Sequence, residues 1–277
     1  MSPIVETASI VGLGLMGGSL AHDLAARGVR VRAYDADERQ LEDAICSGVV
    51  SERLRTDLQD IAADVVVIAV PVDAAAHVLT RVAPFIGEAR LVTDLGSTKA
   101  SIVRAARHLG LSSRFVGSHP MAGDHRSGWR AARRGLFIDA CVYLCPASEE
   151  AMAAASLATR LWTELGAAPE TIAPDEHDRR LAWASHLPHL AAASLALAMS
   201  SAGIARSELG PGGRDTTRLA GSSPELWTAI AVDNAAELDA ALASAEREIA
   251  SFRRALARAD AGELHRRFAA ARQWFEV

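Results

Sequence analysis

The chain has 277 residues; half are hydrophobic, 23% are charged, and the formal net charge is -5. These values are typical of a globular protein with one large or two ordinary domains, and the negative charge argues against a nucleic-acid or anionic-membrane surface. Three cysteines are too few and too badly spaced for a disulfide framework or a structural zinc site, so no metal is expected. The sequence lacks a signal peptide and an apolar run that spans a membrane, which predicts a cytoplasmic protein.

Short β-rich runs alternate with amphipathic stretches over roughly the first 170 residues. Strands are predicted over residues 8–12, 29–34, 65–70, 91–94, 115–117 and 140–145. Helices are predicted over residues 16–26, 38–47, 74–82, 99–109 and 149–165. This alternation predicts an α/β domain with a parallel sheet that helices cover on both faces.

The composition changes after Pro174, because the remaining residues are rich in Ala, Leu, Glu and Arg. Long helices are predicted over residues 178–202 and 223–259, and the GPGG cluster at 210–213 predicts a loop or a helix break. We therefore expect an α/β domain at residues 1–173 and an all-α domain at 174–277. Apolar faces on such helices pack either against a second copy or within one subunit, and both arrangements stay open at this point.

A G-x-G-x-x-G fingerprint directly follows the first predicted strand and opens the first predicted helix. Gly12 would make the tight turn, Gly14 would admit a pyrophosphate, and Gly17 would let the helix and the strand pack closely. This context predicts a Rossmann-type dinucleotide-binding domain, with phosphates at the helix N-terminus. The predicted cofactor-binding residues are Gly12, Gly14, Leu15, Met16, Gly17, Asp35, Val70 and Pro71.

Asp35 ends the second predicted strand, about 20 residues beyond the glycines. A carboxylate there would hold the adenosine ribose and repel the 2′-phosphate of NADP, which favours NAD. Arg39, one turn later, softens that preference, and the alternative is that Asp35 or Asp37 only caps the next helix. Val70 and Pro71 end the third predicted strand, where a cofactor would cross the sheet edge.

Residues 117–123 (GSHPMAG) place His119 between glycines and a proline, directly after an apolar run. A histidine there can take or give a proton near neutral pH, although a tight turn with a surface histidine is the alternative. Four more polar clusters stand out, at residues 93–99, 176–178, 185–189 and 213–227. Each also has a structural explanation, such as a helix cap for Ser97 or an exposed helical ion pair for Asp215 and Arg218.

Taken together and in this order, these segments resemble the prephenate/arogenate dehydrogenase family. The matching residues are 12–18, 94–99, 117–123, 176–178, 185–189 and 214–227, which span nearly the whole chain. The resemblance implies an N-terminal nucleotide-binding domain and a C-terminal helical domain through which the chain forms a homodimer. It also implies oxidation of a small-molecule substrate, prephenate or arogenate, with NAD(P)+, loss of CO2, and release of 4-hydroxyphenylpyruvate or tyrosine.

The resemblance assigns two catalytic roles. His119 matches the histidine that accepts the proton of the ring hydroxyl while hydride leaves the same carbon. Ser97 matches the serine that hydrogen-bonds this histidine and the substrate hydroxyl.

The resemblance also implies that Arg218 binds a substrate carboxylate, because a guanidinium pairs with both oxygens. His189 matches a second polar contact near the reacting end, and Asp215 would orient this cluster. His177 and Trp227 are weaker assignments. The predicted substrate-binding residues are His189, Arg218, Asp215, Asp124, Arg126 and His177.

Residues 124–126 depart from the family pattern, in which many relatives carry a small hydroxyl residue and a glutamate. This chain has Asp124, His125 and Arg126 instead. A carboxylate favours the ammonium group of arogenate, whereas an arginine favours a second carboxylate, so the substrate choice stays open.

Three alternatives remain beside this interpretation. A β-hydroxyacid dehydrogenase shares the glycine fingerprint but needs a catalytic lysine in the second half, and the single lysine is Lys99. An aminodeoxyprephenate dehydrogenase of specialised metabolism would have much the same motifs. A non-enzymatic NAD-sensing dimer would not need Ser97, His119 and Arg218 together. The few residues after the predicted helices lead us to expect no appended regulatory domain.

Overall fold

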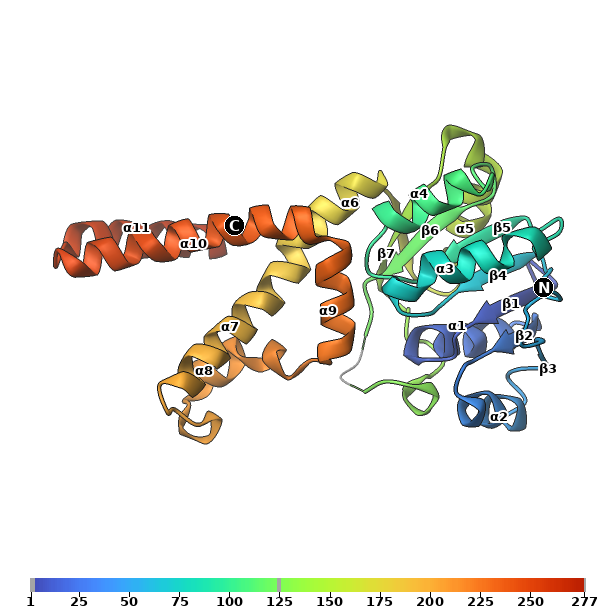
Figure 1. Ribbon diagram of the computed structural model, residues 1–277, viewed down its shortest axis with the longest axis horizontal. Helices are drawn as coiled ribbons and strands as arrows, with labels where there is room; N and C mark the ends of the chain where they lie inside the picture. The colour runs from blue at the N-terminus through green and yellow to red at the C-terminus, as the bar shows by residue number, and fades with distance from the viewer. Residues whose placement is uncertain (1–2, 124–125, 277) are drawn as a thin grey trace. The chain divides into compact units, whose positions relative to one another are not determined.

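The computed structural model describes residues 3–123 and 126–276 (Figure 1). The chain forms two compact units. The first unit consists of Met1–Arg180 and Gly221–Asp233, and the second consists of Leu181–Ala220 and Asn234–Val277. A helical segment late in the sequence therefore belongs to the same unit as the N-terminal sheet.

A five-stranded parallel sheet in the order β3-β2-β1-β4-β5 forms the centre of the first unit. Its strands are β1 (Thr7–Val11), β2 (Arg30–Tyr34), β3 (Glu52–Arg53), β4 (Val65–Ile68) and β5 (Leu91–Asp94). The connecting helices are α1 (Leu15–Ala25), α2 (Glu38–Cys46), α3 (Val72–Val82) and α4 (Ala100–His108). Every residue of β4 and β5 is buried, as in a sheet that is covered on both faces, so this part of the prediction is confirmed.

A three-stranded sheet in the order β6-β7-β8 follows. It consists of β6 (Val116–Pro120), β7 (Cys141–Pro146) and β8 (Ala168–Thr171), and α5 (Met152–Glu164) connects the last two strands. Val92 of β5 and Phe115, just before β6, form a parallel bridge, whereas β6 and β7 run antiparallel. The prediction of a parallel sheet was wrong at β7, because no α-helix lies between β6 and β7 in the part of this segment that the structure describes, and antiparallel neighbours need no crossover helix.

The second half is helical, as predicted, but its helices have other limits. They are α6 (Pro174–Leu181), α7 (Leu187–Ser201), α8 (Pro211–Thr216), α9 (Pro224–Asp233), α10 (Ala235–Ala257) and α11 (Ala261–Phe275). A π-helical turn, Ala182–His186, joins α6 to α7, because Pro188 has no N–H to give to the helix.

The predicted limits in this half differ from the structure in several places. The expected helix at 223–259 is divided at Asn234 into α9 and α10, and α11 was not predicted. The expected loop or helix break at 210–213 holds at Gly210, which is extended and precedes α8, but residues 211–213 already belong to that helix, because Pro211 occupies the first turn, where a missing N–H costs nothing.

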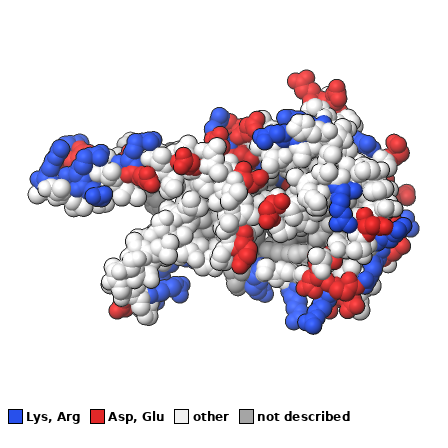
Figure 2. Space-filling view, viewed as in Figure 1, with Lys and Arg blue, Asp and Glu red and all other residues white. Residues whose placement is uncertain are grey.

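Charged side chains of both signs are interspersed on the face of the first unit that Figure 2 shows. Among the described residues no helix is long and apolar enough to cross a bilayer. Within the same residues, no group of three or more His, Cys, Asp or Glu side chains could hold a metal ion.

Candidate active site

The turn between β1 and α1 has the geometry of a dinucleotide-binding turn. Gly12 has a φ of +99°, and a Cβ there would lie 2.4 Å from the carbonyl oxygen of Ala69. A Cβ at Gly17 would lie 2.1 Å from the Gly12 carbonyl oxygen, whereas a Cβ at Gly14 would meet no atom within 4 Å. The fold itself therefore requires the first and third glycines, and Gly14 borders the open space that a pyrophosphate needs.

Leu15 and Met16 open α1 and are half-buried. The N–H groups of a first helical turn have no partner within the helix and carry a partial positive charge, so they suit a phosphate. Val70 and Pro71 follow β4, and the Val70 backbone nitrogen would lie 3.2 Å from a Cβ at Gly12. The predicted contacts therefore line one turn, and the residues present fit NAD.

Asp35 links the end of β2 to the glycine turn. Its carboxylate accepts hydrogen bonds from the N–H of Leu13 at 2.6 Å and from the N–H of Asp37 at 2.8 Å. The helix cap belongs to Asp37, whose carboxylate accepts the N–H of Arg39 at 3.0 Å. Capping is therefore the role of Asp37, and Asp35 is a separate carboxylate beside the glycine turn.

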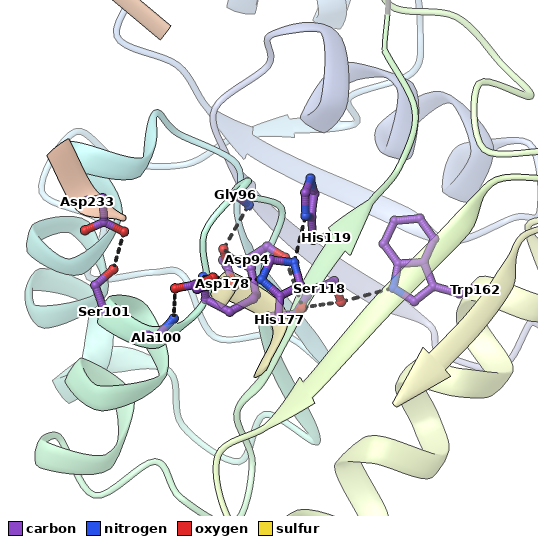
Figure 3. A network of polar contacts seen from close by, with 12 residues as sticks. Asp94, Gly96, Ala100, Ser101, Ser118, His119, Trp162, His177, Asp178 and Asp233 are labelled. Atoms are coloured by element: carbon purple, nitrogen blue, oxygen red, sulfur yellow. Dashed lines mark hydrogen bonds and ion pairs between the residues drawn. The ribbon is translucent and has the colours of Figure 1, made fainter. Parts of the chain in front are cut away.

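His119 lies near the end of β6 and is 9% exposed. Because β6 continues from a parallel bridge with β5, His119 lies at the carboxyl edge of the sheet, where β1 also leads into the glycine turn. Its Nδ1 lies 2.8 Å from Nε2 of His177 (Figure 3), and the two rings meet edge to face. The strand extends beyond the predicted limit at Gly117, so His119 belongs to a strand and not to a turn.

His177 and the adjacent Asp178 form a buried pair on α6. Nδ1 of His177 lies 2.7 Å from Oδ1 of Asp178. Burial lowers the pKa of His177, and the hydrogen bond to Asp178 opposes that effect only in part. Burial alone would raise the pKa of Asp178, but hydrogen bonds from His177 and from the N–H groups of Ala100 and Lys99 hold that pKa below its usual value. At neutral pH the imidazole is therefore neutral and the carboxylate is ionised.

A buried ion pair joins Lys99 to Asp94, and the backbone N–H of Lys99 also donates to Asp178. Both side chains are almost completely buried, and the N–H of Gly96 donates to Asp94 at 2.9 Å. A Cβ at Gly117 would lie 3.0 Å from Cδ of Lys99, so glycine at this position leaves room for the pair.

Ser97 is half-buried and lies between Asp94 and Lys99 in the sequence. Among the described residues no hydrogen bond joins its hydroxyl to His119, whose Nδ1 lies against His177. The contact that the resemblance implied for Ser97 is therefore not formed here. The resemblance assigned His177 only weakly to the site, yet His177 contacts His119 directly.

The second unit brings together two of the predicted substrate-binding residues. Burial and the nearby guanidinium of Arg218 lower the pKa of His189. Arg218 and Asp215 are both exposed, and within the described part of the chain no ion pair joins them. Trp227 is half-buried on α9, in the first unit.

The segment expected to choose the substrate is described only at Arg126, which is exposed. Asp124 and His125 lie outside the described residues. Sequence reasoning also missed Asp178 as a functional residue, although its position directly after His177 was the signal that could have indicated it.

Comparisons with known proteins agree with this geometry. One family model, "Prephenate dehydrogenase, nucleotide-binding domain", matches residues 20–170, and a second, "Prephenate dehydrogenase, dimerization domain", matches residues 173–270. The prephenate dehydrogenase of Bacillus subtilis (strain 168) is 33% identical over 99% of this chain and 76% of its own length.

Two solved structures are similar over nearly the whole chain. Prephenate dehydrogenase from A. aeolicus in complex with hydroxyphenyl propionate and NAD+ has a TM-score of 0.89 and 26% identity, over 100% of this chain and 99% of its own. Synechocystis arogenate dehydrogenase has a TM-score of 0.83 and 28% identity, over 98% of this chain and 99% of its own. The chain belongs to the prephenate dehydrogenase family.

Proposed function

We propose that this chain oxidises prephenate, arogenate or both with NAD+, and releases the ring carboxylate as CO2. The products are 4-hydroxyphenylpyruvate from prephenate and tyrosine from arogenate. The observation that carries the proposal is His119, held against a neutral partner at the sheet edge that also bears the glycine turn. Relatives named for prephenate and for arogenate, each similar over nearly the whole chain, support this substrate class.

The glycine turn and the N-terminus of α1 would hold the pyrophosphate of NAD+, and Asp35 would bind the adenosine ribose. When bound, the nicotinamide accepts the hydride that leaves the ring carbon. Asp37 and Glu38 follow Asp35, so three carboxylates oppose the single guanidinium of Arg39 in this segment. Their charge disfavours a 2′-phosphate, and NAD+ is therefore the preferred cofactor.

His119 acts as the general base of the proposed reaction. Its neutral imidazole takes the proton of the ring hydroxyl while hydride leaves the same carbon, so that the C–O bond becomes a carbonyl. The C–C bond to the ring carboxylate then breaks, CO2 leaves, and the electron pair of that bond completes the aromatic ring as a phenolate, whose oxygen takes back the proton held by His119. Because aromatisation favours this last step, the side chains mainly have to align the ring and remove one proton.

We propose that Arg218 binds a substrate carboxylate, with His189 beside it and Asp215 orienting the cluster. The influence of Arg218 on His189 supports this pairing. Ser97 is proposed to contact the substrate hydroxyl. Residues 124–126 are proposed to distinguish the side chains of prephenate and arogenate.

The assembly and location of the chain belong to the same proposal. We propose a homodimer through the C-terminal helices, which the description of the second family model supports. We propose that the boundary between the two functional domains lies between residues 173 and 174, and the ends of the two family matches, 20–170 and 173–270, support a boundary in this region. The expected cytoplasmic location stays a prediction.

The test is the initial rate of nicotinamide reduction with prephenate and with arogenate, each with NAD+ and with NADP+. We expect turnover with at least one of the two substrates, and a higher kcat/KM with NAD+ than with NADP+. No turnover in any of the four combinations would refute the proposed activity. A preference for NADP+ would refute the role given to Asp35.

A further inference from the structure

We propose that Asp178 is a positioning residue for the proposed reaction: through His177 it fixes the tautomer of His119, so that Nε2 of His119 is the atom that accepts the proton. The inference rests on the proposed role of His119 as the general base. Asp178 contacts His177, and His177 in turn contacts His119.

The carboxylate of Asp178 is held by three N–H groups from two parts of the chain. Oδ1 accepts the backbone N–H of Lys99 at 2.8 Å, and Oδ2 accepts the backbone N–H of Ala100 at 2.8 Å. These two amides open α4, whose N-terminus favours a negative charge. Nδ1 of His177 lies 2.7 Å from Oδ1. Because an ionised carboxylate only accepts hydrogen bonds, this Nδ1 must carry a proton.

The proton on Nδ1 of His177 determines the next contact. A neutral imidazole has one protonated nitrogen, so Nε2 of His177 carries a lone pair. That lone pair lies 2.8 Å from Nδ1 of His119, and two lone pairs do not form a hydrogen bond. Nδ1 of His119 therefore carries the proton and donates it, and in the neutral ring Nε2 carries the lone pair. Figure 3 shows the second nitrogen of His119 at the end of the ring that points away from His177.

The charges around His177 indicate why Asp178, and not another acid, has this role. Asp94 on β5 is the other buried carboxylate near the ring, but it is paired with Lys99. Tyr143 on β7 meets the His177 ring edge to face, with ring centroids 5.5 Å apart. Asp178 is thus the anion that contacts the ring. When His119 takes a proton, its Nδ1–H still donates to His177, and the Asp178 charge stabilises the resulting imidazolium.

Two variants break this chain of hydrogen bonds at different points. Asp178→Asn replaces the anion by an amide of the same shape, so His177 is no longer restricted to one tautomer. His177→Leu removes the link but leaves Asp178 bonded to the N–H groups of Lys99 and Ala100, which keeps the N-terminus of α4 capped. The matched control is Asp175→Asn, because Asp175 is an exposed carboxylate on the same helix.

The direct readout is the ring nitrogen spectrum of the full chain labelled with 15N-histidine, recorded near neutral pH and without substrate. The His119 signals are assigned by their loss in His119→Asn. We expect the Nδ1–H tautomer in the unmodified chain and in Asp175→Asn, and a mixture of tautomers in Asp178→Asn and His177→Leu. The Nε2–H tautomer in the unmodified chain would overturn the proposal.

Kinetics give the second readout. We expect kcat to fall in both variants, by no more than the roughly 10²–10⁴-fold that general-base catalysis supplies, with a much smaller change in KM. The rising limb of the pH–rate profile should move to lower pH in Asp178→Asn, because a neutral amide no longer favours the imidazolium. A normal kcat, an unmoved limb and an unchanged spectrum in the folded variants would refute the role of Asp178 while the proposed function stands. Absence of turnover in the unmodified chain would refute the proposed function, and the nitrogen spectrum would still test the tautomer.

Discussion

Replacing Gly14 by alanine should separate cofactor binding from folding. A Cβ at Gly14 would meet no atom within 4 Å, and its φ of -62° and ψ of -167° are accessible to alanine. Alanine restricts the unfolded chain more than glycine does, which raises the free energy of unfolding. Alanine is also a poorer N-cap for α1 than glycine, which lowers the free energy of unfolding. We therefore expect the free energy of unfolding to change by less than about 1 kcal/mol.

The same methyl group should oppose NAD+, because it occupies the open space beside the N-terminus of α1. Overpacking by one carbon costs about 1–3 kcal/mol, which corresponds to a roughly five- to 150-fold higher Kd. Titration calorimetry with NAD+ measures this loss, and urea unfolding measures the stability of the same preparation. Unchanged NAD+ affinity in a folded Gly14→Ala variant would refute the placement of the pyrophosphate at this turn.

Gly12→Ala is the matched comparison. Its φ of +99° is strained for alanine, and its Cβ would lie 2.4 Å from the carbonyl oxygen of Ala69. The two effects together should lower the free energy of unfolding by about 2–6 kcal/mol. A Gly12→Ala variant as stable as the unmodified chain would contradict the described geometry of the turn.

Three further predictions concern the histidine network. His119→Asn should lower kcat by roughly 10²–10⁴-fold and leave the Kd for NAD+ in calorimetry unchanged; near-normal turnover with the original pH dependence would contradict the general-base role. Lys99→Met leaves Asp94 buried without its counter-ion and should lower the free energy of unfolding in urea by about 3–5 kcal/mol, whereas a loss below about 1 kcal/mol would contradict a buried ion pair. The folded state lowers the pKa of both His177 and Asp178, so the unfolded chain binds more protons as the pH falls. His177 therefore contributes stability above its ordinary pKa of 6.5, and this contribution is lost as the pH falls below that value; the contribution of Asp178 is lost only below 3.8. In His177→Leu the urea midpoint should not show the loss of stability that begins near pH 6.5. The same pH dependence of the urea midpoint in His177→Leu and in the unmodified chain would contradict this prediction.

Local sequence patterns predicted the elements whose structure depends on near neighbours. The apolar runs of β4 and β5 and the glycines of the first turn were correctly placed, because burial and backbone conformation constrain those residues directly. The antiparallel direction of β7 was not predictable in this way, since its apolar run fits either direction. Pairing partners far apart in the sequence decide the direction of such a strand.

In the candidate site, too, local sequence patterns indicated single residues but not the contacts between residues far apart in the sequence. His119 was identified from its flanking glycines and proline, but its contact with His177 joins residues 58 positions apart. The role of Asp178 likewise depends on the start of α4, 78 residues earlier in the chain. No spacing rule connects these segments, and only the packing of α6 against the loop after β5 brings them together.

We propose that oxidation and decarboxylation occur together at His119. The most direct measurement compares the amounts of NADH, CO2 and aromatic product formed when the purified chain acts on prephenate or arogenate. We expect equal amounts of all three, formed roughly 10²–10⁴-fold more slowly by His119→Asn. NADH without an equal amount of CO2, or product formation by His119→Asn at the rate of the unmodified chain, would contradict it.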